Sequence, residues 1–160
     1  MRRDYGPVID EVSRGVRQGV SDEERMQRVA DAVWRAFGGP AGDVSWVGFY
    51  RPDSAGDHLV LGPRRDRPAC SPIGLHGVCG QALGRAKAMV VEDVRTLGEE
   101  YIVCDPADRS ELVVPLIGCD GRPWAVIDLD SHLVDAFGEA DVRGIADVLA
   151  AAGLLPPAAA

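Results

Sequence analysis

The sequence ELVVPLIGCDGRPWAVIDLDS, residues Glu111 to Ser131, decides the fold of this chain. Two runs rich in β-branched and aliphatic residues flank Asp120-Gly121, a dipeptide typical of tight hairpin turns. The segment therefore predicts two antiparallel strands, at 111–118 and 123–131, joined by a short turn.

The second of these strands carries two acidic residues on one face. Asp128 and Asp130 alternate with the apolar residues Ile127 and Leu129, and successive side chains of a strand point to opposite faces of the sheet. The two carboxylates either face solvent or converge on a pocket, and the pattern alone favours solvent.

Helical periodicity marks both ends of the chain. Apolar residues recur at helical spacing in two stretches within residues 4–37, and Ser21 followed by Glu24 predicts a capping box at the start of the second stretch. A further helix is expected at 139–155, followed by a loose tail at 156–160.

Between the helices the periodicity changes to that of β-strands. Residues 43–51 are rich in β-branched and aromatic side chains, and a turn of Pro, Asp, Ser and Gly leads into a second apolar run at 58–62. Together they predict a β-hairpin. In its first strand Trp46 and Tyr50 share one face and Val47 the other, so one face is expected to meet the core while the other can line a cavity.

The middle of the chain predicts a short helix at 77–88, a strand at 89–93 and a long irregular loop at 94–110. This order of elements favours an α+β fold with an antiparallel sheet over a parallel βαβ series. We expect one domain over residues 1–155, with the sheet and a pocket between 43 and 131.

The composition argues against several classes of function. The formal net charge of −8 and the pI near 4.8 disfavour nucleic-acid binding, which needs clustered Lys and Arg. Arg64, Arg65 and Arg67 form the only basic cluster of the central region, and we interpret it as a solvated loop. No apolar run reaches the roughly twenty residues of a membrane span and no secretory signal is present, so a cytoplasmic location without membrane partners is expected.

The four cysteines, Cys70, Cys79, Cys104 and Cys119, are the main candidates for chemistry. No two form the C-x-x-C pair that favours zinc, so we expect no metal, and Cys119 in the predicted turn is interpreted as incidental. The other three lie in loops rich in glycine, proline and acidic residues, which core packing explains poorly. A protease-type nucleophile, with His76 near Cys79, and redox chemistry with attacking and resolving thiols both remain open.

Several motifs in a fixed order resemble those of the GAF-domain free methionine-(R)-sulfoxide reductases, over roughly residues 43 to 145. The motifs are WVGFY at 46–50, LVLGP at 59–63, PAC at 68–70, GVCG at 77–80, VVEDV at 90–94, CD at 104–105 followed by SELVVP at 110–115, and IDLDS at 127–131. Each motif is weak alone, but their common order around three cysteines is specific.

The resemblance implies a GAF fold, in which a central antiparallel sheet of about six strands has helices on one side and a loop-roofed ligand pocket on the other. It implies that free methionine sulfoxide is the substrate, that cysteine thiols reduce it, and that no bound cofactor is needed. An external dithiol reductant such as thioredoxin is then expected to reduce the resulting disulfide.

Position by position, the resemblance implies roles for individual residues. Cys104 would attack the sulfoxide sulfur, with Cys70 as the principal resolving thiol and Cys79 as a second one. Glu111 would supply the proton that the departing oxygen needs, if burial keeps it protonated.

The resemblance also implies how the substrate binds. Asp130, with Asp128 beside it, would bind the ammonium group, and Trp46 and Tyr50 would enclose the S-methyl group. The substrate carboxylate would meet backbone N–H groups of the Gly77–Gly80 segment.

Alternatives to catalysis remain. GAF domains also act as small-molecule sensors, and a redox sensor would use a disulfide between Cys70 and Cys104 as its signal. Three placed cysteines favour the reductase over a ligand-binding module. The first two helices offer a face for a homodimer.

Overall fold

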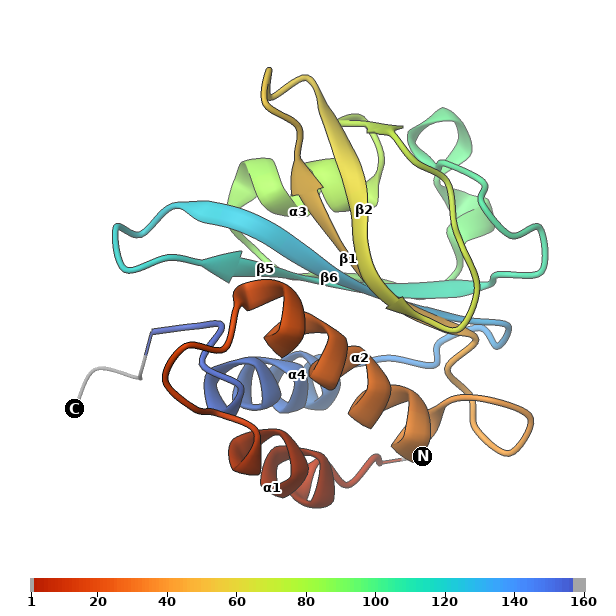
Figure 1. Cartoon of the computed structure of the whole chain (residues 1–160). Helices are drawn as coiled ribbons and strands as arrows, with labels where there is room; N and C mark the ends of the chain where they lie inside the picture. The colour runs from red at the N-terminus through yellow and green to blue at the C-terminus, as the bar shows by residue number, and fades with distance from the viewer. Residues whose placement is uncertain (1, 157–160) are drawn as a thin grey trace.

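A six-stranded antiparallel sheet in the order β3-β2-β1-β6-β5-β4 runs through the centre of the molecule (Figure 1). The structure is a computed structural model that describes residues 2–156, so the predicted loose tail at 156–160 lies outside the described residues apart from Pro156. The strands are β1 (Trp46–Pro52), β2 (His58–Arg65), β3 (Ile73–Gly74), β4 (Met89–Val91), β5 (Ser110–Ile117) and β6 (Pro123–Ser131). The predicted antiparallel α+β architecture is confirmed.

The segment that decides the fold forms the central hairpin of β5 and β6. Its strand bounds agree with the predicted ones to within one residue, and Gly121 makes the turn with a φ of 77°, a conformation that glycine adopts without steric cost. Leu112 lies opposite Leu129, and Glu111 lies opposite Asp130. The hairpin therefore has one apolar face and one face that carries acidic residues.

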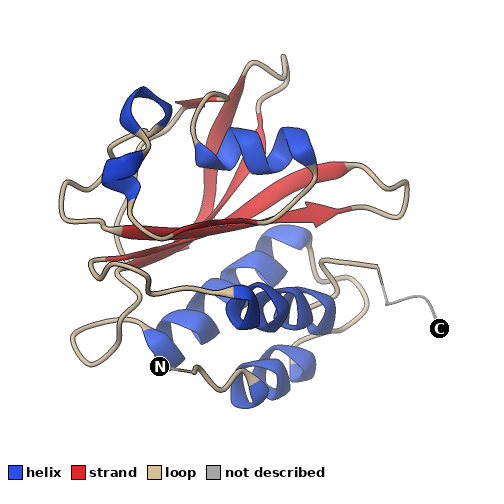
Figure 2. Ribbon diagram, turned by 180° about the vertical axis from the view of Figure 1, so that it is seen from behind, coloured by secondary structure: helices blue, strands red, loops and turns tan. Residues whose placement is uncertain are grey.

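Helices lie on both sides of the sheet (Figures 1 and 2). They are α1 (Gly6–Arg14), α2 (Asp22–Phe37), α3 (Val78–Arg85) and α4 (Glu139–Ala151), with short 3-10 turns η1 (Val94–Thr96) and η2 (Gly98–Glu100). The helices α1, α2 and α4 cover one face, while α3, the 3-10 turns and the long loops cover the other. Within residues 2–156, no helix is both long and apolar enough to cross a lipid bilayer.

Local signals set the ends of the helices. The Ser21 hydroxyl accepts a hydrogen bond from the Glu24 backbone N–H at 3.2 Å, as expected of a helix N-cap. The last helix ends at Ala151, earlier than the predicted residue 155, because Gly153 adopts a φ of 74° and turns the chain away.

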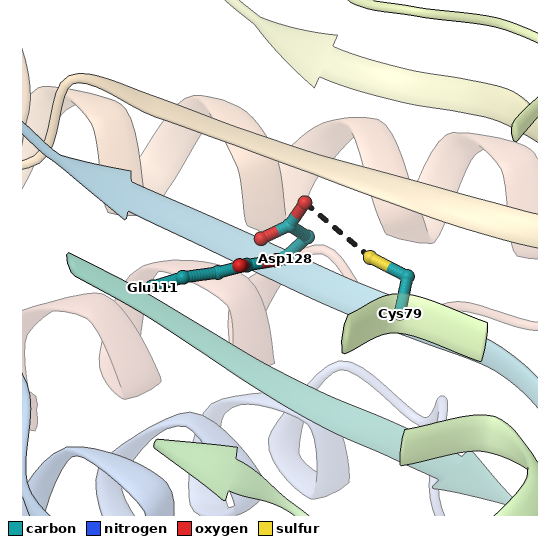
Figure 3. Close-up of side chains that lie close together, drawn as sticks. All are labelled: Cys79, Glu111 and Asp128. Atoms are coloured by element: carbon teal, nitrogen blue, oxygen red, sulfur yellow. Dashed lines mark hydrogen bonds between the residues drawn. The ribbon is translucent and has the colours of Figure 1, made fainter. Parts of the chain in front are cut away.

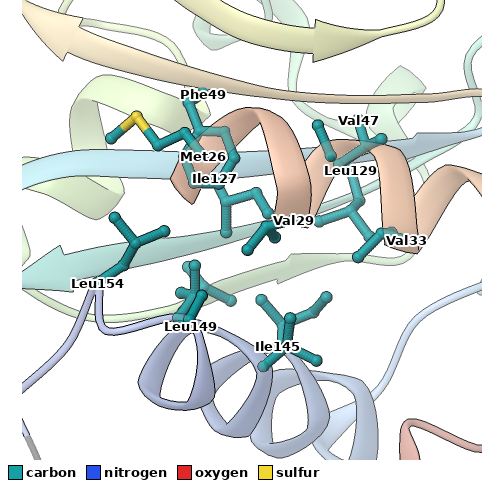
Figure 4. Close-up of a cluster of buried hydrophobic side chains, with 14 of the residues drawn as sticks. Met26, Val29, Val33, Val47, Phe49, Ile127, Leu129, Ile145, Leu149 and Leu154 are labelled. Atoms are coloured by element: carbon teal, nitrogen blue, oxygen red, sulfur yellow. The ribbon is translucent and has the colours of Figure 1, made fainter. Parts of the chain in front are cut away.

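The layer between the sheet and the helices α1, α2 and α4 is the larger apolar core (Figure 4). Alternate residues of the central strands meet the apolar stripes of α2 and α4 there. Its members include Val47, Phe49, Leu112, Ile127 and Leu129 from the sheet and Met26, Val29, Val33, Ile145 and Leu149 from the helices. Full burial of each aliphatic side chain contributes about 1.5–3 kcal/mol. This layer is the scaffold that fixes the side chains on the opposite face of the sheet.

Candidate active site

The three central strands bring the predicted acidic and aromatic residues into two neighbouring rows on the face that carries α3. In one row Trp46 on β1, Asp130 on β6 and Glu111 on β5 lie side by side. In the next row Asp128 lies beside Gly48. One face of the sheet therefore gathers residues that are far apart in the sequence.

The acidic residues on this face are withdrawn from solvent. Asp128 is 7% exposed and Glu111 is 5% exposed, while Asp130 is half-buried. Helix α3 packs across β5 and β6 and covers them. The expectation that the strand pattern favours solvent was wrong for Asp128, while Asp130 is half-buried, because alternation places side chains on one face but does not tell what covers that face.

Burial governs the charge of this acidic cluster. It raises the pKa values of Glu111, Asp128 and Asp130 well above the ordinary range of carboxyl groups, and repulsion among the three adds to the effect. Glu111 Oε2 and Asp128 Oδ1 are buried and have no hydrogen-bond partner among the described residues. Burial therefore favours the protonated forms of these carboxyl groups, and a ligand could supply partners for the two unpartnered oxygen atoms.

Cys79, the second residue of α3, points into this cluster (Figure 3). Its Sγ donates to Asp128 Oδ2 at 3.4 Å, so the protease-type pairing with His76 does not form. Burial, together with repulsion from Asp128 and Glu111, raises the pKa of the Cys79 thiol well above its usual value. Cys79 is therefore a buried, protonated thiol, which is a poor nucleophile.

Cys104 and Cys70 lie together in two loops beside the cluster. The Cys70 thiol donates to the carbonyl oxygen of Val103, the residue before Cys104, at 3.9 Å, so the two cysteines are neighbours. Burial of the thiol, followed by its hydrogen bond with Cys70, raises the pKa of Cys104 to about 12. Tyr50 Oη donates to the Cys70 carbonyl at 2.8 Å, which ties this loop to β1. All the cysteines are free thiols.

A cavity of about 30 Å³ lies among these groups, lined chiefly by Tyr50, Cys79, Tyr101, Cys104, Glu111 and Asp128. Such a volume holds a water molecule or an ion, whereas sites for small organic ligands measure about 300–1,000 Å³. Tyr101 and Ile102 line it from the loop that precedes Cys104, and an amino acid fits only if the lining residues move apart. A larger hollow of about 420 Å³ near Trp34 and His132 contains none of the predicted catalytic residues.

Trp46 and Tyr50 are almost completely buried, with exposed fractions of 3% and 2%. Tyr50 lines the cavity, whereas Trp46 lies behind it with the ring centroids 6.1 Å apart. The indole lies over Gly48, where an added Cβ would come within 2.2 Å of the ring, and its Nε1 donates to the Arg67 carbonyl at 2.8 Å. The absence of a side chain at Gly48 therefore makes room for the Trp46 ring. Contact of Trp46 with a substrate stays a prediction.

The sequence interpretation missed Tyr101, Asp108 and Gly48. Tyr101 lines the cavity from an irregular loop, and burial followed by the charge of Asp130 raises its pKa. Asp108 is 4% exposed, burial raises its pKa to about 6, and the Ser45 hydroxyl donates to it at 3.0 Å. A glycine inside a strand signals close approach of another group, and this signal was available for Gly48.

Asp105 follows Cys104 directly and anchors its loop. Its carboxylate pairs with the Arg67 guanidinium and lies 3.3 Å from His132 Nε2. Asp108 also approaches His132 Nε2, at 3.5 Å, so Asp105, Asp108 and His132 have potential metal-donor atoms within 4.8 Å of one another. Arg67 already balances the negative charge of Asp105. The group of Asp105, Asp108 and His132 therefore acts as an ion-paired anchor for the loop that carries Cys104.

A second group of three potential metal donors is buried beside the cavity. The Cys79 sulfur and a carboxylate oxygen from each of Glu111 and Asp128 lie within 4.8 Å of one another. Unlike the Asp105 group, none of these three side chains forms an ion pair with Arg, Lys or His within residues 2–156. These three residues are therefore the ones whose chemistry fits a metal ion.

Comparisons with known proteins agree with this architecture. A model of the GAF domain family matches residues 20–154. Over 131 residues the chain is 33% identical to the free methionine-R-sulfoxide reductase of Saccharomyces cerevisiae, which covers 78% of this chain and 72% of that protein. The solved structure of the free methionine-R-sulfoxide reductase of Neisseria meningitidis in complex with its substrate matches with a TM-score of 0.80 at 32% identity, over 94% of this chain and 89% of that chain.

A third match is a candidate GAF sensor protein of Burkholderia vietnamiensis, with a TM-score of 0.80 at 30% identity over 92% of this chain and 89% of that chain. The family model spans most of the chain, and the yeast and Neisseria reductases are matched over more than two thirds of their own length. The chain belongs to the GAF-domain family of free methionine-R-sulfoxide reductases.

Proposed function

We propose that this protein reduces free methionine (R)-sulfoxide to methionine, with Cys104 as the attacking thiol. The observation that carries the proposal is the placement of Cys104 in a cavity lined by Glu111 and Asp128, with Cys70 in the neighbouring loop, in a chain that belongs to the reductase family. The protein is accordingly an oxidoreductase that acts on a sulfur group.

The chemistry has two steps that balance in atoms and electrons. The Cys104 sulfur attacks the sulfoxide sulfur, the sulfoxide oxygen takes a proton from Glu111 and is transferred to Cys104 as a sulfenic acid, and methionine leaves. The proton of the Cys104 thiol restores Glu111. The Cys70 thiol then attacks the Cys104 sulfur, the hydroxyl leaves as water with the Cys70 proton, and a disulfide forms.

The electrostatics of the cluster support these roles. Burial and the charge of Asp130 raise the pKa of Glu111, so this group holds a proton that it can donate at neutral pH. Burial is the main cause of the raised pKa of Cys104, and the charge of Asp128 adds to it. A substrate ammonium group beside Asp128 would offset that charge and ease the loss of the thiol proton.

The acidic cluster suits the ammonium group of a free amino acid. A bound ammonium group would lower the pKa values of Asp130 and Asp128 and pair with the ionised carboxylates, and the unpartnered Asp128 Oδ1 would accept one of its N–H groups. The substrate carboxylate would meet the N–H groups of Gly77–Gly80, because the first turn of a helix leaves its donors free. Trp46 and Tyr50 would enclose the methyl group. Peptide-bound methionine sulfoxide lacks the free ammonium, so this site would favour the free amino acid.

Cys70 takes the principal resolving role in this proposal because its thiol lies against the backbone beside Cys104, whereas the Cys79 thiol, which takes the second role, meets Asp128. An external dithiol such as thioredoxin would reduce the disulfide, since the residue Cys104 is exposed even though its thiol is partly desolvated beside the cavity, and no bound cofactor is required. We place the reaction in the cytoplasm, where free thiols persist. Residues 1–155 would act as one domain, and a homodimer through α1 and α2 stays a prediction.

A non-catalytic sensing module is the second candidate. The likeness to the candidate sensor protein and a cavity too small for an amino acid favour it. A redox sensor would form the disulfide between Cys70 and Cys104 with peroxide and would not turn over methionine sulfoxide.

Consumption of the R and S isomers of free methionine sulfoxide, with a dithiol as reductant, separates the two functions. The reductase proposal expects the wild-type protein and the control Cys119→Ser to consume the R isomer alone, and Cys104→Ser to consume neither. If wild-type protein consumes neither isomer while peroxide oxidises its thiols, the sensing function replaces the proposal.

A further inference from the structure

We infer that Cys79, Glu111 and Asp128 form a binding site for one borderline-soft divalent cation such as Zn²⁺, and that the bound ion excludes the substrate. The cation site is independent of the proposed function. The exclusion of substrate by the ion rests on the proposed function.

The first support is the geometry of the three donors, which come from α3, β5 and β6 (Figure 3). Their donor atoms all lie within 4.8 Å of one another. In a tetrahedral zinc site, Zn–S and Zn–O bonds of about 2.3 Å and 2.0 Å separate sulfur and oxygen ligands by roughly 3.5 Å. Cys79 Sγ and Asp128 Oδ2 are 3.4 Å apart, so these two donors already stand at the required spacing.

The second support is that two buried side chains have unused oxygen atoms beside a small cavity. Glu111 and Asp128 are each more than nine-tenths buried, and each has an oxygen atom without a hydrogen-bond partner among the described residues. The adjoining cavity of about 30 Å³ accepts an ion without the movement of lining residues that an amino acid requires. The structure as it stands therefore fits a cation better than it fits the substrate.

The chemistry of the donors selects the class of ion. No Lys or Arg lines this cavity among the described residues, so no fixed positive charge opposes a cation there. A thiolate ligand favours Zn²⁺ and similar ions over Mg²⁺ and Ca²⁺, which prefer oxygen ligands. Binding would release the thiol and carboxyl protons. The C-x-x-C criterion does not detect such a site, because its ligands are dispersed along the chain.

Binding can be tested without substrate. The reduced protein, freed of reductant, is titrated with Co²⁺, because a bond between Co²⁺ and a thiolate absorbs in the near ultraviolet. We expect one Co²⁺ per chain with this absorption, displaced by one Zn²⁺. The absorption should vanish in Cys79→Ser and persist in Cys70→Ser, Cys104→Ser and Cys119→Ser. Asp128→Asn, whose fold is checked by circular dichroism, should weaken Zn²⁺ binding by roughly tenfold or more.

An absence of thiolate absorption in the wild-type protein, or absorption that survives Cys79→Ser, would overturn the cation site. If Cys79→Ser does not fold, unchanged Zn²⁺ affinity in Asp128→Asn and Glu111→Gln would overturn it as well. The exclusion is tested separately, in a single turnover without dithiol, where stoichiometric Zn²⁺ should suppress methionine formation and a chelator should restore it. If the protein shows the Co²⁺–thiolate absorption but does not reduce methionine sulfoxide, the proposed function is wrong and the cation site is supported.

Discussion

The guanidinium of Arg67 pairs with the carboxylate of Asp105, and this ion pair joins the loop that carries Cys70 to the loop that carries Cys104. Asp105 follows Cys104 directly, and Arg67 precedes Cys70 by three residues. The Arg67 carbonyl also accepts the hydrogen bond from the Trp46 indole, which links the pair to β1. The ion pair therefore helps to hold the two thiols close to each other.

We predict that Arg67→Gln slows formation of the disulfide between Cys70 and Cys104 by roughly two- to fivefold, the range expected for an exposed ion pair. The first step, formation of methionine, should keep its rate because Arg67 does not line the cavity. Rapid-quench measurement of methionine, with dimedone trapping of the sulfenic acid, separates the two steps. The matched control is Arg65→Gln, because Arg65 pairs with Asp31 in the same exposed part of the chain. Equal effects of the two variants would show that the pair with Asp105 has no positioning role.

Glu111→Gln should lower the rate of methionine formation by roughly 100-fold or more, since it removes a general acid. KM should change little, because glutamine keeps the size and hydrogen-bonding capacity of the side chain. The pH profile adds a second test. The active form of Glu111 is the protonated one, so the rate of the wild-type protein should fall as pH rises through the raised pKa of this group. A variant that changes KM and leaves the chemical rate intact contradicts the assigned role.

The carboxyl group of Asp128 should destabilise the protein at neutral and alkaline pH. Its folded pKa is raised by burial and then by Glu111, so its contribution to stability is present below the unfolded pKa of about 3.9 and is lost as pH rises through the folded pKa. We predict that Asp128→Asn melts at a higher temperature than the wild-type protein near neutral pH, with the gain shrinking as pH falls.

Asp93→Asn provides a control of opposite sign. The hydrogen bond from Arg109 lowers the pKa of Asp93, so its contribution is present above the unfolded pKa and is lost as pH falls. This variant should melt below the wild-type protein at neutral pH, with a difference that shrinks on acidification. Thermal melts of both variants across pH test these two opposite pH dependences. A stability gain for Asp128→Asn that grows on acidification would contradict the predicted pH dependence of the Asp128 contribution.

Gly48→Ala should lower the free energy of unfolding by about 1–3 kcal/mol, because the new methyl group overlaps the Trp46 ring and forces repacking. Gly62→Ala is a matched control in the paired strand β2, where the nearest atoms to an added Cβ lie at 3.4 Å or more. Urea unfolding compares the two. Similar losses for both variants would mean that the strand, and not the indole, resists the substitution.

The sequence predicted the elements whose cause is local. The hairpin of β5 and β6 follows from alternation around Asp120-Gly121, and the start of α2 follows from Ser21. The surroundings of Asp128 were not predictable in this way, because α3 reaches them through a long-range contact. Tyr101 was missed for the same reason, since an irregular loop has no periodicity that indicates which side chain turns inward.

The cysteines illustrate the same division. Cys70 and Cys104 lie in loops, as the neighbouring proline and acidic residues predicted, but Cys79 lies in α3, and the chemical environment of each thiol depends on the tertiary structure. Cys79 meets a carboxyl group of β6, whereas Cys104 meets the thiol of Cys70. Sequence spacing contains no information on these partners.

The most direct test of the account is a single turnover of the reduced protein with free methionine (R)-sulfoxide and no external dithiol. We predict one methionine per chain and a disulfide that joins Cys70 to Cys104, identified by mass spectrometry of the digested protein. Cys104→Ser should yield no methionine, and Cys70→Ser should yield methionine but leave Cys104 as a sulfenic acid. Methionine formation by Cys104→Ser, or a wild-type product in which Cys104 remains a free thiol, would contradict the account.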